Sequence, residues 1–242
     1  MEKNRQNAAA LLTDCCEKMG VPLAEEQTRQ FMAYLVLLLE WNEKMNLTAI
    51  TEEREVVLKH FADSLSLAPA IGQGALSVID VGTGAGFPGL PLKIARPEIR
   101  LTLLDSLQKR IGFLEEVKAQ LGLENVSCIH SRAEDGGQNP AYREQFDLCV
   151  SRAVAALPIL LEYCLPFVKV GGYFAALKGP DAEAEAAESR TALEKLGGRL
   201  TEIRDVDIPG TDLAHKLVFI EKTAPTPPQY PRKAGKIGKK PL

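Results

Sequence analysis

The sequence predicts an α/β protein in which a mostly parallel sheet follows a helical segment. After residue 71, short β-rich runs alternate with amphipathic helical patterns. Such alternation is typical of a parallel sheet with helices on both faces. The first seventy residues show helical spacing, and the loop between the last two β-rich runs is too short for a crossover helix. These two runs are therefore expected to pair antiparallel at the sheet edge.

Three helices are predicted in an N-terminal helical extension, residues 1–70. The first spans Asn7–Met19 and stops at a glycine, and the second spans Leu23–Met45 with apolar residues at helical spacing. The third runs toward Leu67, with Thr51 as its expected N-cap and two acids in its first turn.

The sheet domain is predicted to cover residues 71–222. Its seven strands are expected at Ser77–Val81, Arg100–Leu104, Val126–His130, Phe146–Val150, Tyr173–Leu177, Leu200–Asp207 and Lys216–Glu221. Helices are expected between them at Pro88–Ala95, Leu107–Leu121, Leu157–Val168 and Asp181–Leu196. Residues 223–242 form a basic tail rich in proline and lysine, which we expect to be extended and mobile.

The charge is unevenly distributed along the chain. The net charge of −3 combines 29 basic with 32 acidic residues, a balance that is unusual for a nucleic-acid-binding protein. However, all of the acids lie at or before Glu221, whereas six bases follow it. Residues 1–221 therefore carry a net charge of −9 and the remainder +6. The distribution indicates an acidic body with a basic tail that contains no acid.

Several classes of protein are excluded by composition. The longest strongly apolar run, Phe31–Leu39, is far shorter than the roughly 20 residues that span a bilayer. No secretion signal opens the chain, and its five cysteines include no C-x-x-C pair. We therefore expect a cytoplasmic protein with no membrane segment, no disulfide framework and no metal site.

A glycine-rich loop is the sharpest motif. The pattern D-x-G-x-G-x-G begins at Asp80, near the end of the first predicted strand, and continues through Gly82, Gly84 and Gly86. A helix is expected directly after Phe87. Such glycines allow a tight turn and close approach to a ligand, which the free amides of the helix N-terminus can bind. The loop therefore predicts a nucleotide-like ligand.

Two cofactors are compatible with this loop. A dinucleotide fingerprint, G-x-G-x-x-G, fits only when it starts at Gly84, which puts Pro88 where the helix begins and leaves Asp80 unexplained. The spacing from Asp80 resembles the S-adenosylmethionine loop of class I methyltransferases, where no pyrophosphate opposes an acid. We favour S-adenosylmethionine over a nicotinamide cofactor.

Other strand ends add candidates for the same site. Asp105 ends the second strand, where it can accept hydrogen bonds from a ribose. Ala133 and Glu134 follow the third strand, where an amide and an acid can contact an adenine edge. Arg152 ends the fourth strand and faces the same crevice.

A set of ordered motifs then points to one family. They are Trp41-Asn42, Asn46–Thr48, His60–Ser64, Asp80–Gly89, Leu104–Ser106, Lys109-Arg110, Phe113-Leu114, Ser131–Glu134, Ser151–Ala153, Ala176–Gly179 and Tyr230–Lys233. Over roughly residues 35–242 the chain resembles the RsmG (GidB) family of bacterial 16S rRNA methyltransferases. The resemblance implies a Rossmann-like class I fold and transfer of a methyl group from S-adenosylmethionine to N7 of a guanosine near the decoding centre.

The resemblance also implies roles for individual residues. Gly82, Gly84 and Phe87 would contact the cofactor, Asp105 and Ser106 its ribose, and Ala133 and Glu134 its adenine. Arg152 would lie beside the methionine end or the target base. Asn46, His60, Asp63 and Lys178 match positions in or around the active site, and we hypothesise that Arg152 and Lys178 hold the base and a neighbouring phosphate. Before the last strand, where the family often has an arginine, this chain has His215 and Lys216.

The chemistry fits the residues that are present. Guanine N7 has a free lone pair and no proton, so methyl transfer needs alignment rather than a general base. No N/D-P-P-Y/F motif follows the fourth strand, as would be common in amino methyltransferases. The partner is expected to be 16S rRNA or the small ribosomal subunit, bound by a monomer. A non-catalytic ribosome-assembly factor and a methyltransferase for small molecules or proteins remain the alternatives.

Overall fold

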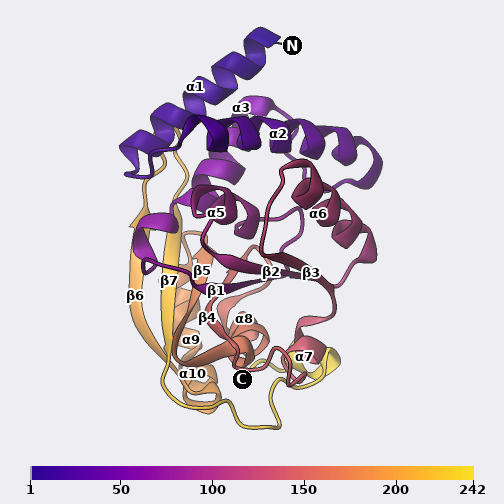
Figure 1. Cartoon of the computed structure of the whole chain (residues 1–242). Helices are drawn as coiled ribbons and strands as arrows, with labels where there is room; N and C mark the ends of the chain where they lie inside the picture. Colours follow the sequence, from indigo (N-terminus) through magenta and orange to yellow (C-terminus); the bar gives the residue numbers. More distant parts are fainter. Residues whose placement is uncertain (1) are drawn as a thin grey trace.

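The computed structural model describes residues 2–242, except for the side chains of residues 2–4 and 234, and contains one seven-stranded sheet (Figure 1). The strands run β3-β2-β1-β4-β5-β7-β6 across the sheet. Their bounds are β1 Ser77–Val81, β2 Arg100–Asp105, β3 Val126–His130, β4 Phe146–Arg152, β5 Val168–Lys178, β6 Gly198–Val206 and β7 His215–Lys222. Strands β1 to β5 pair in parallel, and β7 is antiparallel to both β5 and β6. The predicted architecture is thereby confirmed.

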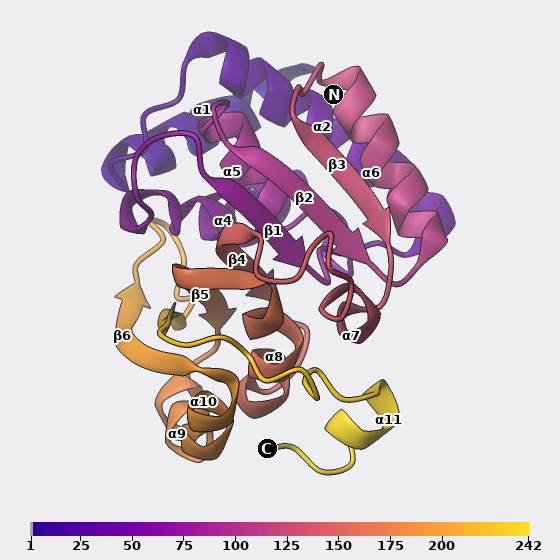
Figure 2. The same cartoon turned by 60° about the horizontal axis from the view of Figure 1, so that its bottom comes forward.

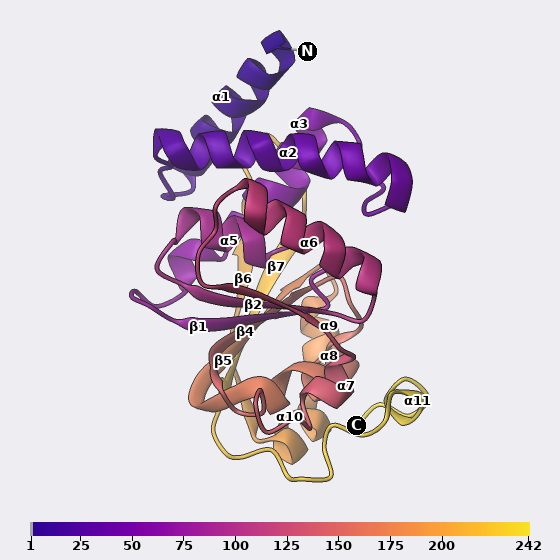
Figure 3. The same cartoon turned by 45° about the vertical axis from the view of Figure 1, so that its right-hand side comes forward.

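Helices cover both faces of the sheet because successive strand residues point to opposite sides. In β1, Val78 joins the core under α5 (Gly89–Ala95) and α6 (Gln108–Gln120), whereas Ile79 joins the core on the other face. That second core is closed by α8 (Leu157–Cys164), α9 (Ala182–Glu188) and α10 (Arg190–Leu196). The two groups of helices lie on opposite sides of the sheet in Figure 3.

The N-terminal helices form a further layer over α5 and α6. Helices α1 (Glu2–Lys18) and α2 (Glu25–Met45) share one hydrophobic core with that face of the sheet domain. The Gln27 side-chain amide also donates to the carbonyl of Ile94 in α5, at 2.9 Å. The segment predicted as residues 1–70 is therefore packed tightly against the sheet domain.

The helix predicted from Thr51 differs in its beginning and its geometry. It starts as α3 (Glu53–Val56) after Glu52, so the expected Thr51 N-cap is wrong. It then widens into a π-helical stretch, η1 (Val57–Ala62), before α4 (Asp63–Leu65). Local π-helical geometry is often found at functional sites, and this stretch contains His60.

The C-terminal tail packs against the body rather than extending away from it. Figure 2 shows it passing α8 toward the short helix α11 (Ala234–Ile237). The guanidinium of Arg143 donates to the carbonyls of Thr226 at 2.6 Å and Tyr230 at 2.8 Å. The composition of the tail did not indicate this packing, because the acceptors are backbone carbonyls, which every residue has.

An aromatic cluster joins the N-terminal helices to the glycine loop. The buried ring of Tyr34 lies 5.3 Å from that of Phe61 and 5.5 Å from that of Phe87, and its hydroxyl donates to the carbonyl of Ala85. Paired aromatic rings and a satisfied buried hydroxyl are both stabilising. Tyr34 thus supports the loop from the helical side.

Replacing Tyr34 with phenylalanine should lower the free energy of unfolding by about 1–3 kcal/mol, because the carbonyl of Ala85 loses its buried donor. Urea denaturation measures this change. Tyr173→Phe, at a ring that is 41% exposed, serves as the control and should be nearly neutral. Equal stability of the two variants would contradict the supporting role of Tyr34.

Candidate cofactor and substrate site

Most of the predicted site residues lie at the carboxyl ends of the central strands, whereas Asn46, His60 and Asp63 come from the helical segment. The chain moves outward from β1 to β2 and β3, then returns to place β4 on the other side of β1. The crevice at such a reversal of strand order is where open α/β sheets bind ligands. The glycine loop follows β1 and Arg152 ends β4, so both face this crevice.

Asp80 holds the glycine loop from beneath. Its Oδ2 accepts hydrogen bonds from the Thr83 hydroxyl at 2.7 Å and the Gly89 amide at 2.8 Å. Its Oδ1 is buried and has no partner among the described residues. Burial raises the pKa of Asp80 to about 7. Asp80 therefore fixes both ends of the loop and does not line the pocket beside it.

The three predicted glycines meet different constraints. Gly84 has φ +61° and open space where a Cβ would stand, and its amide donates to Asp105 Oδ2 at 2.9 Å. A Cβ at Gly82 would lie 2.6 Å from the side chain of Val154. At Gly86, with φ +100°, the space is filled by neighbouring side chains. The loop thus has open space at Gly84 and packs tightly at Gly82 and Gly86.

A pocket of about 330 Å³ lies between this loop and the ends of β2 and β3. Five of the predicted cofactor residues line it: Gly82, Asp105, Ser106, Ala133 and Glu134. The remaining lining residues are Val81, Leu104, Arg110, Ser131, Arg132, Ala153, Val154 and Tyr163. The predicted adenosine-binding residues therefore form one pocket.

The two acids in the pocket can accept hydrogen bonds. Asp105 Oδ1 accepts from the Leu107 amide at 2.9 Å, and Oδ2 lies 3.2 Å from Arg110 Nη1. A carboxylate oxygen takes two hydrogen bonds, so Oδ1 retains one acceptor position for a ribose hydroxyl. Glu134 is 8% exposed and lies in the first turn of α7 (Ala133–Gly136). This donor and acceptor set fits an adenosine.

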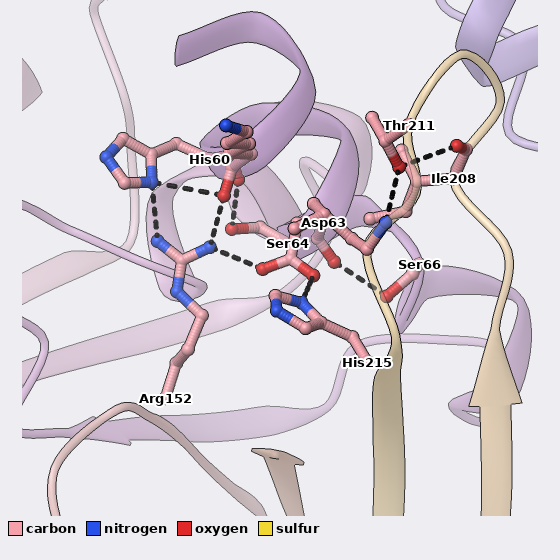
Figure 4. A network of polar contacts seen from close by, with 10 residues as sticks. His60, Asp63, Ser64, Ser66, Arg152, Ile208, Thr211 and His215 are labelled. Carbon is pink, nitrogen blue, oxygen red and sulfur yellow. Dashed lines mark hydrogen bonds and ion pairs between the residues drawn. The ribbon is translucent and has the colours of Figure 1, made fainter. Parts of the chain in front are cut away.

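A polar network surrounds the buried Asp63 carboxylate (Figure 4). Asp63 Oδ2 accepts from Arg152 Nη1 at 2.7 Å, and Asp63 Oδ1 accepts from His215 Nδ1 at 2.7 Å. Burial would raise the pKa of Asp63, but the His215 hydrogen bond and the Arg152 charge outweigh it and hold that pKa below its ordinary value. The same hydrogen bond raises the pKa of His215. The network thus joins the helical segment to both β4 and β7.

His60 and Phe87 form a wall beside Arg152. The two rings stack at 4.6 Å, and the Arg152 guanidinium lies 5.0 Å from the Phe87 ring. Burial and the Arg152 charge lower the pKa of His60 to about 4, so its ring is neutral at pH 7. His60 Nδ1 lies 3.3 Å from Arg152 Nη2 and 3.1 Å from the Lys59 carbonyl. Nε2 lies 2.8 Å from the Thr48 hydroxyl.

Lys178 lies apart from this network, at the end of β5. Its Nζ donates to the carbonyl of Ala155 at 2.9 Å and forms an ion pair with Glu185 at 2.8 Å. Ala155 belongs to the loop that follows β4. Lys178 therefore fixes the loop that lies next to Arg152.

Sequence reasoning missed some contacts near His60. Asn46 ends α2 in the left-handed conformation with φ 49°, and its side chain makes no hydrogen bond within residues 5–242. Instead, Asn42 Oδ1 accepts from the Thr48 amide at 2.8 Å, which positions the Thr48 hydroxyl for His60. Both residues stand in quoted motifs, but their spacing alone does not show which side chain faces the site.

The described residues offer no group of three or more His, Cys, Asp or Glu side chains able to hold a metal ion. Within the described part of the chain, none of the helices is long and apolar enough to cross a membrane.

Comparison with known proteins gives a consistent result. A family model described as GidB, rRNA small subunit methyltransferase G, matches residues 27–212. A protein named ribosomal RNA small subunit methyltransferase G from Alkaliphilus metalliredigens is 52% identical over 96% of this chain and 98% of its own length. A protein of the same name from Acetivibrio thermocellus is 50% identical over the whole of both chains.

Solved structures support the fold. A methyltransferase from Aquifex aeolicus, described as dependent on S-adenosylmethionine (SAM), has a TM-score of 0.51 and 23% identity over 68% of this chain and 92% of its own. A TYW2 protein from M. jannaschii, solved with AdoMet, has a TM-score of 0.54 and 16% identity over 72% of this chain and 79% of its own. The predicted class I methyltransferase fold is confirmed.

The ion pair between His215 and Asp63 should make stability depend on pH. A raised folded-state pKa of His215 adds stability that is complete below the ordinary pKa of about 6.5 and is lost as the pH rises through the folded value. His215→Gln should therefore destabilise the protein more at pH 5.5 than at pH 9, as measured by urea denaturation. His130→Gln, at an exposed histidine, is the control. An equal loss at both pH values would contradict the ion pair.

Proposed function

The chain belongs to the GidB family, rRNA small subunit methyltransferase G, and we propose how its crevice carries out the reaction of that family. It is a methyltransferase that uses S-adenosylmethionine and acts on N7 of a guanosine in 16S rRNA. The observation that carries the proposal is the arrangement of two sites on either side of one loop. The adenosine pocket lies on one side, and the network of Arg152, Asp63 and His60 lies on the other.

The adenosine pocket is proposed to hold the cofactor. Asp105 would accept from the ribose, Ser106 would lie beside it, and Ala133 and Glu134 would flank the adenine. The bare backbone at Gly84 would lie against the part of the cofactor that continues toward Phe87. When bound, S-adenosylmethionine supplies an electrophilic methyl group.

The residues around Arg152 are proposed to hold the target guanine. In the described part of the chain, Asp63 and the Lys59 carbonyl accept both N–H groups of Arg152 Nη1. Donors on Nη2 and Nε remain, and guanine O6 is an acceptor that arginine recognises. The His60 ring, which is half-buried and stacks on the buried Phe87, would contribute an aromatic face for the base.

No general base is required at this site. Guanine N7 carries a lone pair and no proton, so the protein contributes alignment, exclusion of water and a fixed charge. The neutral state of His60 suits this task, because Arg152 is then left as the positive charge of the network that can face the base. Asp63 holds Arg152 in place through a buried charge pair.

Lys178 is proposed to contact the RNA while it fixes the loop after β4. Two of its three N–H donors are directed to Ala155 and Glu185, so one remains for a phosphate next to the target. Asn46, exposed at the end of α2, is proposed to lie along the RNA path.

The setting of the reaction is also part of the proposal. We propose that a monomer acts on the RNA of the small ribosomal subunit in the cytoplasm, without a bound metal. The reaction itself needs no Lewis acid to activate the nucleophile, because guanine N7 carries no proton.

Methyl transfer to small ribosomal subunits, or to their naked RNA, tests the proposed function directly. Purified protein with radiolabelled S-adenosylmethionine should label 16S rRNA, and mass-spectrometric mapping should find a single 7-methylguanosine. Cofactor binding without transfer to either substrate would favour a non-catalytic assembly factor. Transfer only to a protein or small molecule would contradict the RNA assignment.

Arg152→Lys should reduce the methylation rate about a hundredfold, because a lysine cannot hold Asp63, the Lys59 carbonyl and the base at once, and small misplacements cost that much. Calorimetry should show a dissociation constant for S-adenosylmethionine within about threefold of the original, since the adenosine pocket is built by other residues. Arg100→Lys, at the opposite edge of the sheet, is the matched control. An unchanged rate would remove Arg152 from the proposed site.

A further inference from the structure

The tail carries a set of positive charges that the adenosine pocket and the Arg152 network do not use. Of the six bases after Glu221, Lys222 is fully buried and forms an ion pair with Glu144, and Arg232 forms an ion pair with Glu162. The other four, Lys233, Lys236, Lys239 and Lys240, are exposed, and within the described residues none of them forms an ion pair. We call these four residues the tail lysines.

The tail lysines are held in a defined position. Arg232 donates from its backbone amide and its guanidinium to Glu162, at 2.6–3.2 Å, and the Glu162 side chain is fully buried in α8. Gln138 donates to the carbonyls of Pro228 and Pro231 at 3.2 and 3.1 Å. Burial of Ile237 secures the other side of the segment. These contacts fix the backbone that carries the four charges.

Local geometry gathers three of the four tail lysines, Lys233, Lys236 and Lys239, around one hollow. The amide of Lys236 donates to the carbonyl of Lys233 at 2.8 Å, and that of Lys240 to the carbonyl of Lys236 at 3.0 Å, so successive lysines follow a helical path. A hollow of about 560 Å³ is lined by Gln229, Pro231, Arg232, Lys233, Gly235, Lys236 and Lys239. It is positively charged and contains no acidic side chain.

The segment that carries the hollow packs against α7 and α8, which also border the adenosine pocket. Glu162, which anchors Arg232, precedes Tyr163, a lining residue of that pocket. Pro231 lies 3.0 Å from the position of a Cβ at Gly137, directly after α7, and α7 begins with Ala133 and Glu134 of the same pocket. An RNA strand that enters the crevice would therefore pass close to the hollow.

We propose that the tail lysines bind the phosphate backbone of the RNA that flanks the target nucleotide. This inference rests on the proposed function, because it assigns a second contact surface to the same substrate. Lysine ammonium groups bind phosphates as point charges and contribute sequence-independent affinity. The acidic body, with a net charge of −9 over residues 1–221, repels RNA, so an anchored basic surface beside the site is where attraction is needed.

A fourfold variant with glutamine at positions 233, 236, 239 and 240 tests the proposal while retaining Arg232 and Lys222. At 0.1 M salt, binding to naked 16S rRNA should weaken at least tenfold, and the slope of log K against log salt should fall by about 3. Calorimetry should show unchanged binding of S-adenosylmethionine. The control replaces Lys18, Arg29, Arg100 and Lys118 with glutamine; these bases lie on α1, α2, β2 and α6.

Two results would overturn the proposal. If the tail variant and the control have equal affinity and equal salt slopes, the tail lysines do not bind RNA. If the tail variant loses affinity for assembled subunits but not for naked RNA, the surface binds a ribosomal protein instead. Failure of the proposed function is distinguishable, because the unaltered protein would then methylate neither substrate.

Discussion

The buried ion pair between Asp63 and Arg152 is the interaction on which the rest of the site depends. It joins a helical turn near residue 60 to the last residue of β4, and the Asp63 side chain is 1% exposed. A charge buried to that extent is costly unless it is paired and hydrogen-bonded. Removing either partner would leave the other charge unsatisfied. The helical segment is therefore fixed relative to the sheet at the point where the crevice opens.

The aromatic cluster and the polar network act on the same loop from two directions. Tyr34 bonds to Ala85 from the helical side, while Arg152 and His60 pack on Phe87. Asp80 holds the loop from within the sheet. A reaction that relies on alignment needs such rigidity, because small displacements of the reacting atoms have large effects on rate. This explains why so many buried polar contacts surround a site without a general base.

The sequence predicted the adenosine pocket better than the polar network. Asp105 ends β2 and Glu134 comes shortly after β3, and parallel strands bring their carboxyl ends to one edge, so local motifs were sufficient. The contacts of Asp63 with Arg152 and His215 join residues 89 and 152 positions apart, and no local pattern encodes them. Thr48 was missed for a similar reason, since its bond to His60 depends on how α2 ends. The predicted N-cap at Thr51 was wrong because the helix begins at Glu53, and Glu52 is its N-cap.

The sequence shows that the tail is basic, but the expectation that the tail is extended was wrong. Its proline and lysine content is typical of mobile segments, yet Lys222 and Arg232 form ion pairs with Glu144 and Glu162 on the body. Composition treats all six bases alike, whereas the fold divides them into two that anchor and four that remain exposed. The buried Glu162 would be unfavourable without Arg232, so the pair favours one position of the tail over others. Ordering the segment before binding lowers the entropic cost of binding RNA. The anchoring bases therefore serve the same end as the exposed ones, since they hold the exposed charges where a phosphate backbone would pass.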